Sequence, residues 1–285
     1  MVIEGKWNGN RYKVLGQIGA GNFGRVYRVL DHKGDIRAVK VSEDILSITN
    51  EYNSMLKLGC FPFIPKVYDF DDWTVKGRTY PFIVMDYIEG NNLKEIMTLE
   101  KLEPKTVFKI GKLLTDIMIK IYKLGFRYTD IKLENIIIDN RGKVFFVDFG
   151  SLTQKGMPTK EYTPTYNIKS WGLKGKGYKA CISFSITMVM VSLLKREEFN
   201  PLVISLEEVI QRIHRLPLNG RQKRLLIDGL RGKYADLNRY SKALTSLLQQ
   251  ENNPYKLDKI DYILIISIVS FVFIAIFGVK SYLSW

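Results

Sequence analysis

Cysteine and histidine are scarce in this chain of 285 residues, and their scarcity removes several classes of protein from consideration. The two cysteines, Cys60 and Cys181, lie far apart without CxxC spacing, so neither a disulfide framework nor a zinc site is expected. The two histidines, His32 and His214, are too few for a histidine-rich metal site. The polar first ten residues do not resemble a signal peptide. A reduced, cytosolic environment for the main domain is the simplest interpretation.

Acidic residues are also outnumbered. The chain has 43 Lys+Arg against 29 Asp+Glu, a net charge of +14. Residues 1–150 hold 23 basic and 19 acidic residues, a balance of +4, whereas residues 151–259 hold 19 and 9, a balance of +10. The excess therefore lies in the second half, where it would attract anionic lipid, nucleic acid or acidic proteins. A lysine-rich solvated surface is the equally weighted alternative.

Charge is absent from one long stretch near the C-terminus. The 18 residues Tyr262–Val279 are uncharged, which approaches the roughly 20 apolar residues of a spanning helix. A buried core helix is less favoured, because cores rarely use so long a run that is apolar on all faces. We expect a juxtamembrane linker at 251–260 and a transmembrane helix at 261–281. Lys256 and Lys259 precede the run and a single lysine follows it, so the positive-inside rule predicts a single-pass cell-membrane protein with its main domain in the cytoplasm.

The rest of the chain divides into a strand-rich part at 1–90 and a mainly helical part at 91–250. Apolar and polar residues alternate in Arg25–Leu30 and Ile36–Val41, as is typical of strands. Apolar residues recur at helical spacing in Lys105–Leu124. The remaining expected elements are a helix at Leu46–Leu58 and short strands at Ile136–Asp139 and Lys143–Val147. This pattern predicts two lobes, one rich in strands and one helical.

A glycine-rich pattern, GxGxxGxV, occupies residues 19–26 in the first part. Glycines let backbone amides approach a phosphate closely. A dinucleotide-binding loop shares GxGxxG but opens a helix, whereas here Arg25–Val29 continues as a strand. The pattern therefore favours a hairpin that covers phosphates. Lys40 ends the next strand, where its charge would neutralise the α- and β-phosphates.

The segment Tyr128–Asn135 is followed thirteen residues later by Asp148-Phe149-Gly150. These residues match the family patterns HRDLKxxN and DFG at their Asp, Lys, Asn and second Asp. On these motifs the chain resembles the Hanks-type, eukaryotic-like bacterial serine/threonine protein kinases, in a short form with one C-terminal transmembrane helix. The resemblance runs from about Tyr12 to Leu248. It implies an α+β, bilobal protein-kinase-like fold, with a small β-rich N-lobe and a minimal helical C-lobe.

The resemblance also implies roles for the polar residues of these motifs. Asp130 would orient the substrate hydroxyl and accept its proton, and Lys132 would offset charge on the γ-phosphate as it is transferred. Asn135 and Asp148 would hold Mg²⁺, a cation that prefers oxygen ligands. The implied cofactors are therefore ATP and Mg²⁺.

The expected ATP-binding residues follow from the same resemblance. Lys40 would bind the phosphates and Glu51 would fix its position, with Glu43 as a weaker candidate because the gap from Lys40 to Glu51 is shorter than usual. Backbone groups of Asp86 and Tyr87 would bind adenine. The other expected nucleotide-binding residues are Ile18, Gly19, Ala20, Gly21, Asn22, Gly24, Val26, Ala38 and Ile137. The apolar residues in this list are equally compatible with plain core packing.

Several positions depart from the family pattern. Tyr128 and Thr129 stand where the family has His and Arg. The Arg normally pairs with a phosphate on the activation loop, so Thr129 predicts that switching by activation-loop phosphorylation is weak or absent. The segment from Thr163 resembles the family's TPxY, so Thr163 is expected to bridge Asp130 and Lys132 and to favour Ser/Thr substrates. The APE motif and the acidic start of the next helix are replaced, which weakens the C-lobe scaffold and spares the transfer chemistry.

The function predicted from the sequence is ATP-dependent phosphorylation of Ser/Thr hydroxyls on proteins by a membrane-anchored kinase. The basic clusters Lys169–Lys179 and Arg221–Arg224 predict a C-lobe surface for DNA or anionic lipid, and a homodimer in the membrane is one candidate for control. The alternatives are a membrane-anchored pseudokinase scaffold, a small-molecule kinase and a nucleic-acid-binding protein in which the kinase is regulated or vestigial. The pseudokinase is disfavoured because five polar motif residues are all retained: Lys40, Asp130, Lys132, Asn135 and Asp148. The small-molecule kinase is disfavoured by the TPxY-like segment.

Overall fold

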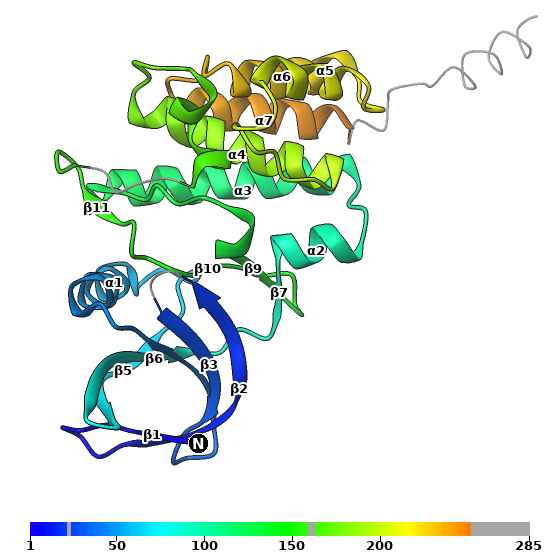
Figure 1. The fold of residues 1–285 in the computed structure, drawn as a ribbon. Coiled ribbons are helices and arrows are strands. Elements are labelled where there is room, and N and C mark those ends of the chain that lie inside the picture. Colours follow the sequence, from blue (N-terminus) through cyan, green and yellow to red (C-terminus); the bar gives the residue numbers. More distant parts are fainter. Residues whose placement is uncertain (22–23, 159–162, 252–285) are drawn as a thin grey trace, which may run out of the picture. The chain divides into compact units, whose positions relative to one another are not determined.

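The computed structural model describes residues 1–21, 24–158 and 163–251. The chain divides into two compact units, residues 1–245 and residues 246–285. The first unit has the two expected lobes, one built on a sheet and one built from helices (Figure 1). The predicted transmembrane helix lies outside the described residues.

The strand-rich lobe is a six-stranded antiparallel sheet in the order β1-β2-β3-β4-β6-β5. Its strands are β1 Val2–Glu4, β2 Arg11–Gly21, β3 Gly24–Leu30, β4 Ile36–Val41, β5 Val67–Val75 and β6 Arg78–Asp86. The two strands predicted from alternation are therefore present as β3 and β4. A buried apolar cluster holds the lobe together and consists of Ile3, Tyr12, Val29, Val39, Val41, Phe82 and Val84.

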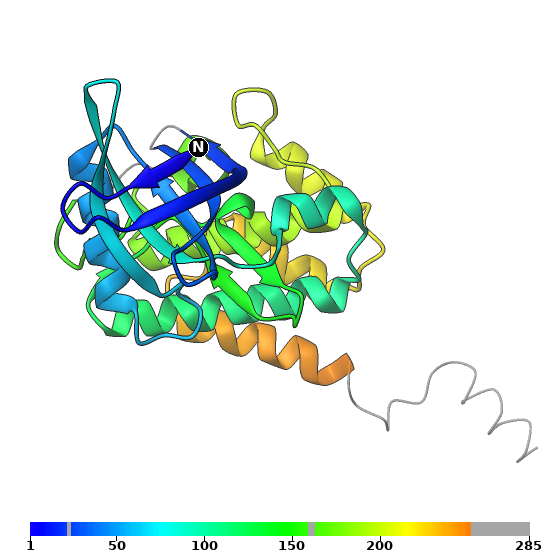
Figure 2. The ribbon, with the colours of Figure 1, turned by 90° about the horizontal axis from the view of Figure 1, so that it is seen from below.

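Helix α1, Ile45–Leu58, lies beside β5 and β6, and Figure 2 shows it next to the curved sheet. The Asp44 carboxylate accepts hydrogen bonds from the backbone N–H groups of Leu46 and Ser47, both at 3.0 Å. Such an N-cap stabilises a helix by about 1 kcal/mol. The helix agrees with the one predicted at this position. Its inward face carries Glu51, a carboxylate among buried apolar residues.

The second lobe is mainly helical, as predicted. Its helices are α2 Leu93–Leu99, α3 Pro104–Lys123, α4 Tyr178–Lys195, α5 Leu206–His214, α6 Gly220–Leu230 and α7 Leu237–Glu251. The short strands β7 Gly90–Asn92, β9 Ile136–Asp139 and β10 Val144–Phe146 form a three-stranded sheet, and β8 Phe126–Arg127 pairs with β11 Thr153–Gln154. The strands predicted around the turn at residues 140–142 are thus β9 and β10. Figure 1 shows β7, β9 and β10 between the sheet and the helices.

Helix α4 forms the core of the helical lobe between α3 and α6. Among the described residues, α4 is the one helix whose length and composition would let it cross a membrane. However, 83% of it is buried inside the fold. A helix that is apolar on all sides suits a position in the core of a lobe. Close packing depends on a small neighbour, because a Cβ on Gly229 would lie 2.1 Å from Thr187 Oγ1. Helix α4 is therefore best explained as a buried core helix.

Candidate active site

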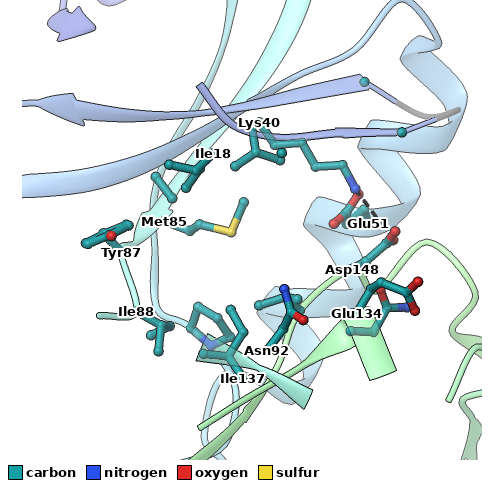
Figure 3. Close-up of a pocket in the computed structure, with 18 of the residues that line it drawn as sticks. Ile18, Lys40, Glu51, Met85, Tyr87, Ile88, Asn92, Glu134, Ile137 and Asp148 are labelled. Carbon is teal, nitrogen blue, oxygen red and sulfur yellow. Dashed lines mark hydrogen bonds and ion pairs between the residues drawn. The ribbon is translucent and has the colours of Figure 1, made fainter. Parts of the chain in front are cut away.

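A cavity of about 540 Å³ lies between the two lobes (Figure 3). The β2–β3 hairpin, β4 and α1 contribute from one lobe, and the segments around β9 and β10 contribute from the other. The cavity gathers most of the residues singled out in the sequence. Those that line it are Ile18, Gly19, Ala20, Gly21, Gly24, Val26, Ala38, Lys40, Glu51, Asp86, Tyr87, Lys132, Asn135, Ile137, Asp148 and Thr163.

The glycine-rich segment forms a β-hairpin, in which Gly19 pairs with Val26 and Gly21 with Gly24. It continues into a strand, as expected for a phosphate-covering hairpin and unlike a dinucleotide-binding loop. Gly24 has a φ of +137°, and a Cβ there would lie 2.2 Å from the carbonyl oxygen of Val41. Only glycine fits this position. The expected nucleotide-binding residue Asn22 lies outside the described residues.

Lys40 and Glu51 form a buried ion pair at the back of the cavity. Lys40 Nζ lies 2.6 Å from Glu51 Oε2, and the two residues are 7% and 2% exposed. Glu43 is exposed at the surface, so the structure places Glu51 beside Lys40 instead of the weaker candidate. Burial alone would lower the pKa of Lys40, but the charges of Glu51 and Asp148 outweigh it and raise that pKa. Lys40 is therefore a fixed cation.

Asp148 faces Lys40, with its Oδ1 atom 3.5 Å from Nζ. Its φ of +65° is uncommon for a residue other than glycine. The hydroxyl of Tyr128 donates a hydrogen bond to the backbone carbonyl of Asp148 at 3.2 Å, and the Tyr128 ring packs against Phe149 at 5.8 Å between centroids. Burial, followed by the charges of nearby carboxylates, raises the pKa of Tyr128, which keeps this hydroxyl protonated. Tyr128, at the family's His position, thus supports the backbone of Asp148.

Three donors hold the carboxylate of Asp130. Thr163 Oγ1 donates to Oδ1 at 2.8 Å, while Lys132 Nζ and Asn135 Nδ2 lie 2.7 and 3.0 Å from Oδ2. Thr163 therefore contacts Asp130 as expected, and Lys132 meets Asp130 directly. Asn135 Nδ2 also donates to the backbone carbonyl of Asp130 at 3.0 Å. The amide oxygen is thus the atom that Asn135 has left to offer a cation.

Tyr178, in the first turn of α4, is a site residue that the sequence did not indicate. Its hydroxyl accepts a hydrogen bond from the backbone N–H of Tyr128 at 3.0 Å and donates one to the Tyr128 carbonyl at 3.1 Å. The first turn of α4 has no acidic residue. Tyr178 therefore fastens the segment that carries Asp130 to the core helix. No pattern singles this tyrosine out, because the contact joins positions 50 residues apart.

Val26, Ala38 and Ile137, which were predicted to pack on adenine, are among the residues that line the cavity. The backbone N–H of Asp86 donates to the carbonyl of Lys66 at 2.9 Å. The N–H of Asp86 is therefore already used within the fold. Further lining residues missed by sequence reasoning are Pro65, Met85, Ile88, Asn92, Glu134 and Val147.

Comparison with known proteins agrees with this geometry. Residues 12–250 match the family model of the protein kinase domain. The serine/threonine-protein kinase YabT of Bacillus subtilis is 30% identical over 265 residues, which cover 90% of this chain and 78% of that protein. The serine/threonine-protein kinase PrkC of the same species is 30% identical over 172 residues, or 57% of this chain and 26% of that protein. The cAMP-dependent protein kinase type 3 of Saccharomyces cerevisiae is 29% identical over 169 residues, or 56% of this chain and 41% of that protein.

Proposed function

Because the chain belongs to the protein kinase family and is a protein serine/threonine kinase, we propose that the cavity between the lobes binds Mg-ATP and delivers its γ-phosphate to a protein hydroxyl. One observation carries this proposal. Lys40, Glu51 and Asp148 form a charged cluster in one cavity, next to Asn135 and the triply bonded Asp130. Groups from both lobes are thereby arranged around one position for a triphosphate.

The N-lobe residues bind and orient the nucleotide in this proposal. The glycine-rich hairpin covers the phosphates, Lys40 binds the α- and β-phosphates, and Glu51 keeps Lys40 in place. Asp86 accepts a hydrogen bond from the adenine edge through its backbone carbonyl, and Tyr87 continues the same segment. The apolar residues of the two lobes pack on the two faces of the base.

The C-lobe residues hold the reacting groups. Asp130 Oδ1 and Oδ2 orient the substrate hydroxyl, and the carboxylate accepts its proton as the oxygen attacks phosphorus. Lys132 neutralises charge on the transferred group. Thr163 holds the Asp130 carboxylate by the 2.8 Å hydrogen bond.

The donor set fits a magnesium ion that is bound together with a nucleotide. Mg²⁺ usually takes one or two protein carboxylates or other oxygens and completes its shell with phosphate oxygens and water. Asn135 and Asp148 supply an amide oxygen and a carboxylate. The described residues contain no group of three or more His, Cys, Asp or Glu that would hold a metal without the nucleotide. When bound, the ion supplies charge neutralisation at the phosphates.

Replacing Asp148 by Asn should remove most of the Mg²⁺-dependent gain in ATP affinity. Mutating a residue that only hydrogen-bonds to a metal ligand typically lowers metal affinity by roughly ten- to a hundredfold. Loss of a ligand itself should therefore lower the affinity at least about tenfold. Calorimetric titration of the full-length chain with ATP, in Mg²⁺ and in EDTA, measures this gain. Asp35→Asn, at an exposed carboxylate paired with Arg37, is the matched control. An undiminished gain in the Asp148 variant would contradict the assignment.

The same proposal includes an anchor in the cell membrane, with the kinase domain in the cytoplasm. We divide the chain into an N-lobe at 1–90, a C-lobe at 91–250, a linker at 251–260 and a transmembrane helix at 261–281. The uncharged run near the C-terminus supports this division. The full-length chain should stay with the membrane pellet after an alkaline carbonate wash, and release into the supernatant would contradict it.

The basic C-lobe offers a surface for an anionic regulator. Residues 151–259 carry 19 basic against 9 acidic residues, a balance of +10. Lys169 and Lys174 are exposed, whereas Trp171 between them is buried at 8% exposure. Cations interleaved with aromatic rings suit DNA, whereas cations alone suit anionic lipid. A homodimer formed through the membrane segment would bring two such surfaces together.

A further inference from the structure

The side chain and the backbone N–H of Asp86 are both held by the start of the neighbouring strand. Asp86 ends β6, and its backbone carbonyl is the group proposed to meet adenine. The backbone N–H of Lys66, just before β5, donates to Asp86 Oδ2 at 2.9 Å, and the Tyr68 hydroxyl donates to Oδ1 at 2.7 Å. The N–H of Asp86 donates to the Lys66 carbonyl at 2.9 Å. Asp86 therefore has little freedom to turn.

A β-bulge supplies the tyrosine that bonds Asp86. In the β5–β6 ladder the pairing shifts by one residue between Val67 and Asp69, which leaves Tyr68 as the extra residue. Such bulges re-aim a side chain and are common next to active sites. Burial, and then the hydrogen bond to Asp86, raises the pKa of Tyr68, so its hydroxyl stays a donor at neutral pH. The extra residue thus provides a fixed donor to the Asp86 carboxylate.

Arg37 holds the same pair of residues from β4. It pairs directly with Asp86 in the β4–β6 ladder, and opposed residues point to the same side of a sheet. Its guanidinium lies 3.8 Å from the Tyr68 ring centroid, and Nη1 lies 3.8 Å from Asp86 Oδ1. Asp31 pairs with Nε at 3.2 Å, and the side chains of this ion pair are only 16% and 10% exposed. A planar guanidinium suits such combined stacking and ion pairing better than a lysine does.

These supporting residues bear on a ligand only through Asp86. In the part of the chain that the structure describes, Asp86 and Tyr87 line the cavity, whereas Arg37 and Tyr68 do not. Figure 3 shows Tyr87 at the opposite end of the cavity from Asp148. The support therefore acts at the end away from the groups assigned to Mg²⁺.

We propose that Arg37 and Tyr68 are positioning residues that direct the Asp86 backbone carbonyl at the 6-amino group of adenine and thereby select ATP over GTP. The inference rests on the proposed Mg-ATP function of the cavity and names the residues that set its nucleotide choice. Adenine presents an amino donor at this position, whereas guanine presents a carbonyl oxygen, which is an acceptor. A carbonyl held in place bonds the first and leaves two acceptors facing each other with the second. Sites built around one such hydrogen bond strongly reject an analogue that cannot form it.

Arg37→Met should relax the choice between the two nucleotides. We expect the ratio of kcat/KM for ATP to kcat/KM for GTP to fall at least about tenfold through a higher KM for ATP. A smaller folded fraction would lower kcat with both nucleotides and leave this ratio unchanged. Steady-state transfer by the full-length chain to an acceptor protein, with Mg-ATP and Mg-GTP in parallel, measures the ratio. Arg11→Met, at a surface pair whose arginine side chain is 71% exposed, is the matched control and should keep the wild-type ratio.

Tyr68→Phe keeps the test decisive if Arg37→Met does not fold. It removes the hydroxyl that donates to Asp86 and keeps the ring that stacks on Arg37. The ratio should fall in the same direction, by at least about threefold, because one hydrogen bond to the carboxylate is lost. A wild-type ratio in Tyr68→Phe, or in folded Arg37→Met, would overturn the positioning role and leave the proposed function standing. A wild-type chain that uses ATP and GTP equally well would instead contradict the adenine site itself, and this inference with it.

Discussion

Replacing Lys40 by methionine should lower the free energy of unfolding by about 3–5 kcal/mol, the usual cost of breaking a buried ion pair by removal of one partner. Glu51 is 2% exposed and lies 2.6 Å from Lys40. Without Lys40, this carboxylate stays buried next to Asp148, a second negative charge. Equilibrium unfolding of the full-length chain in detergent, with wild type alongside, measures the difference.

The loss of unfolding free energy in Lys40→Met, relative to wild type, should grow as pH rises from about 4 to neutral. Burial raises the pKa of Glu51, and Lys40 offsets only part of that rise in the wild type. Loss of Lys40 raises this pKa further above the unfolded value of about 4.3. A group with a raised folded-state pKa favours the fold below the unfolded pKa and loses that contribution as pH rises through the folded pKa. The gap to wild type should therefore be smallest near pH 4 and widen towards neutral pH.

A double variant separates stability from function. Lys40→Met with Glu51→Leu replaces both charges by apolar groups, so it should recover most of the lost stability. It should not recover phosphate transfer, because the cation is still missing. Lys233→Met, at a surface pair whose lysine is 59% exposed, is the control and should change stability by less than about 1 kcal/mol. Equal losses at Lys40 and Lys233 would contradict a buried pair.

Replacing Asp130 by asparagine should lower kcat by about 10²–10⁴, the usual contribution of a general base. The change keeps the shape of the side chain but removes the carboxylate. It also turns one oxygen into an amide nitrogen, which either faces the donors Lys132 and Asn135 or displaces Thr163. KM for ATP should change little, because Asp130 contacts the hydroxyl substrate. Steady-state transfer to an acceptor protein measures both constants.

Two companion variants sharpen this result. Thr163→Val removes one hydrogen bond to Asp130 and should cause a smaller loss of kcat than Asp130→Asn. Asp35→Asn, at an exposed position just before β4, should leave kcat unchanged. If Asp130→Asn retained wild-type kcat, another group would have to accept the proton.

Local patterns were sufficient to predict the elements that carry the site. The hairpin followed from a glycine pattern that runs on into a strand. The helix predicted at Leu46–Leu58 already put Glu51 inside a helix and Glu43 before it. The structure adds the cap at Asp44 and places Glu51 on the inward face of α1, beside Lys40.

Contacts between distant segments could not be predicted. Tyr178 bonds the backbone of Tyr128 across 50 residues, and no periodicity or motif marks such a pair. The backbone N–H of Asp86, at the end of β6, donates to the carbonyl of Lys66, just before β5. This contact depends on the pairing of β5 with β6. Arg127 and Thr153 face each other only because β8 and β11 pair. These features depend on tertiary structure, whereas motif spacing reports local chemistry.

The most direct test of the central claim is transfer of labelled γ-phosphate from Mg-ATP by the full-length chain to an acceptor protein, followed by identification of the labelled amino acids. The account predicts label on phosphoserine or phosphothreonine with wild type, and a loss of about 10²–10⁴ with Asp130→Asn. Absence of label with wild type that still binds ATP, or equal labelling by the variant, would contradict it.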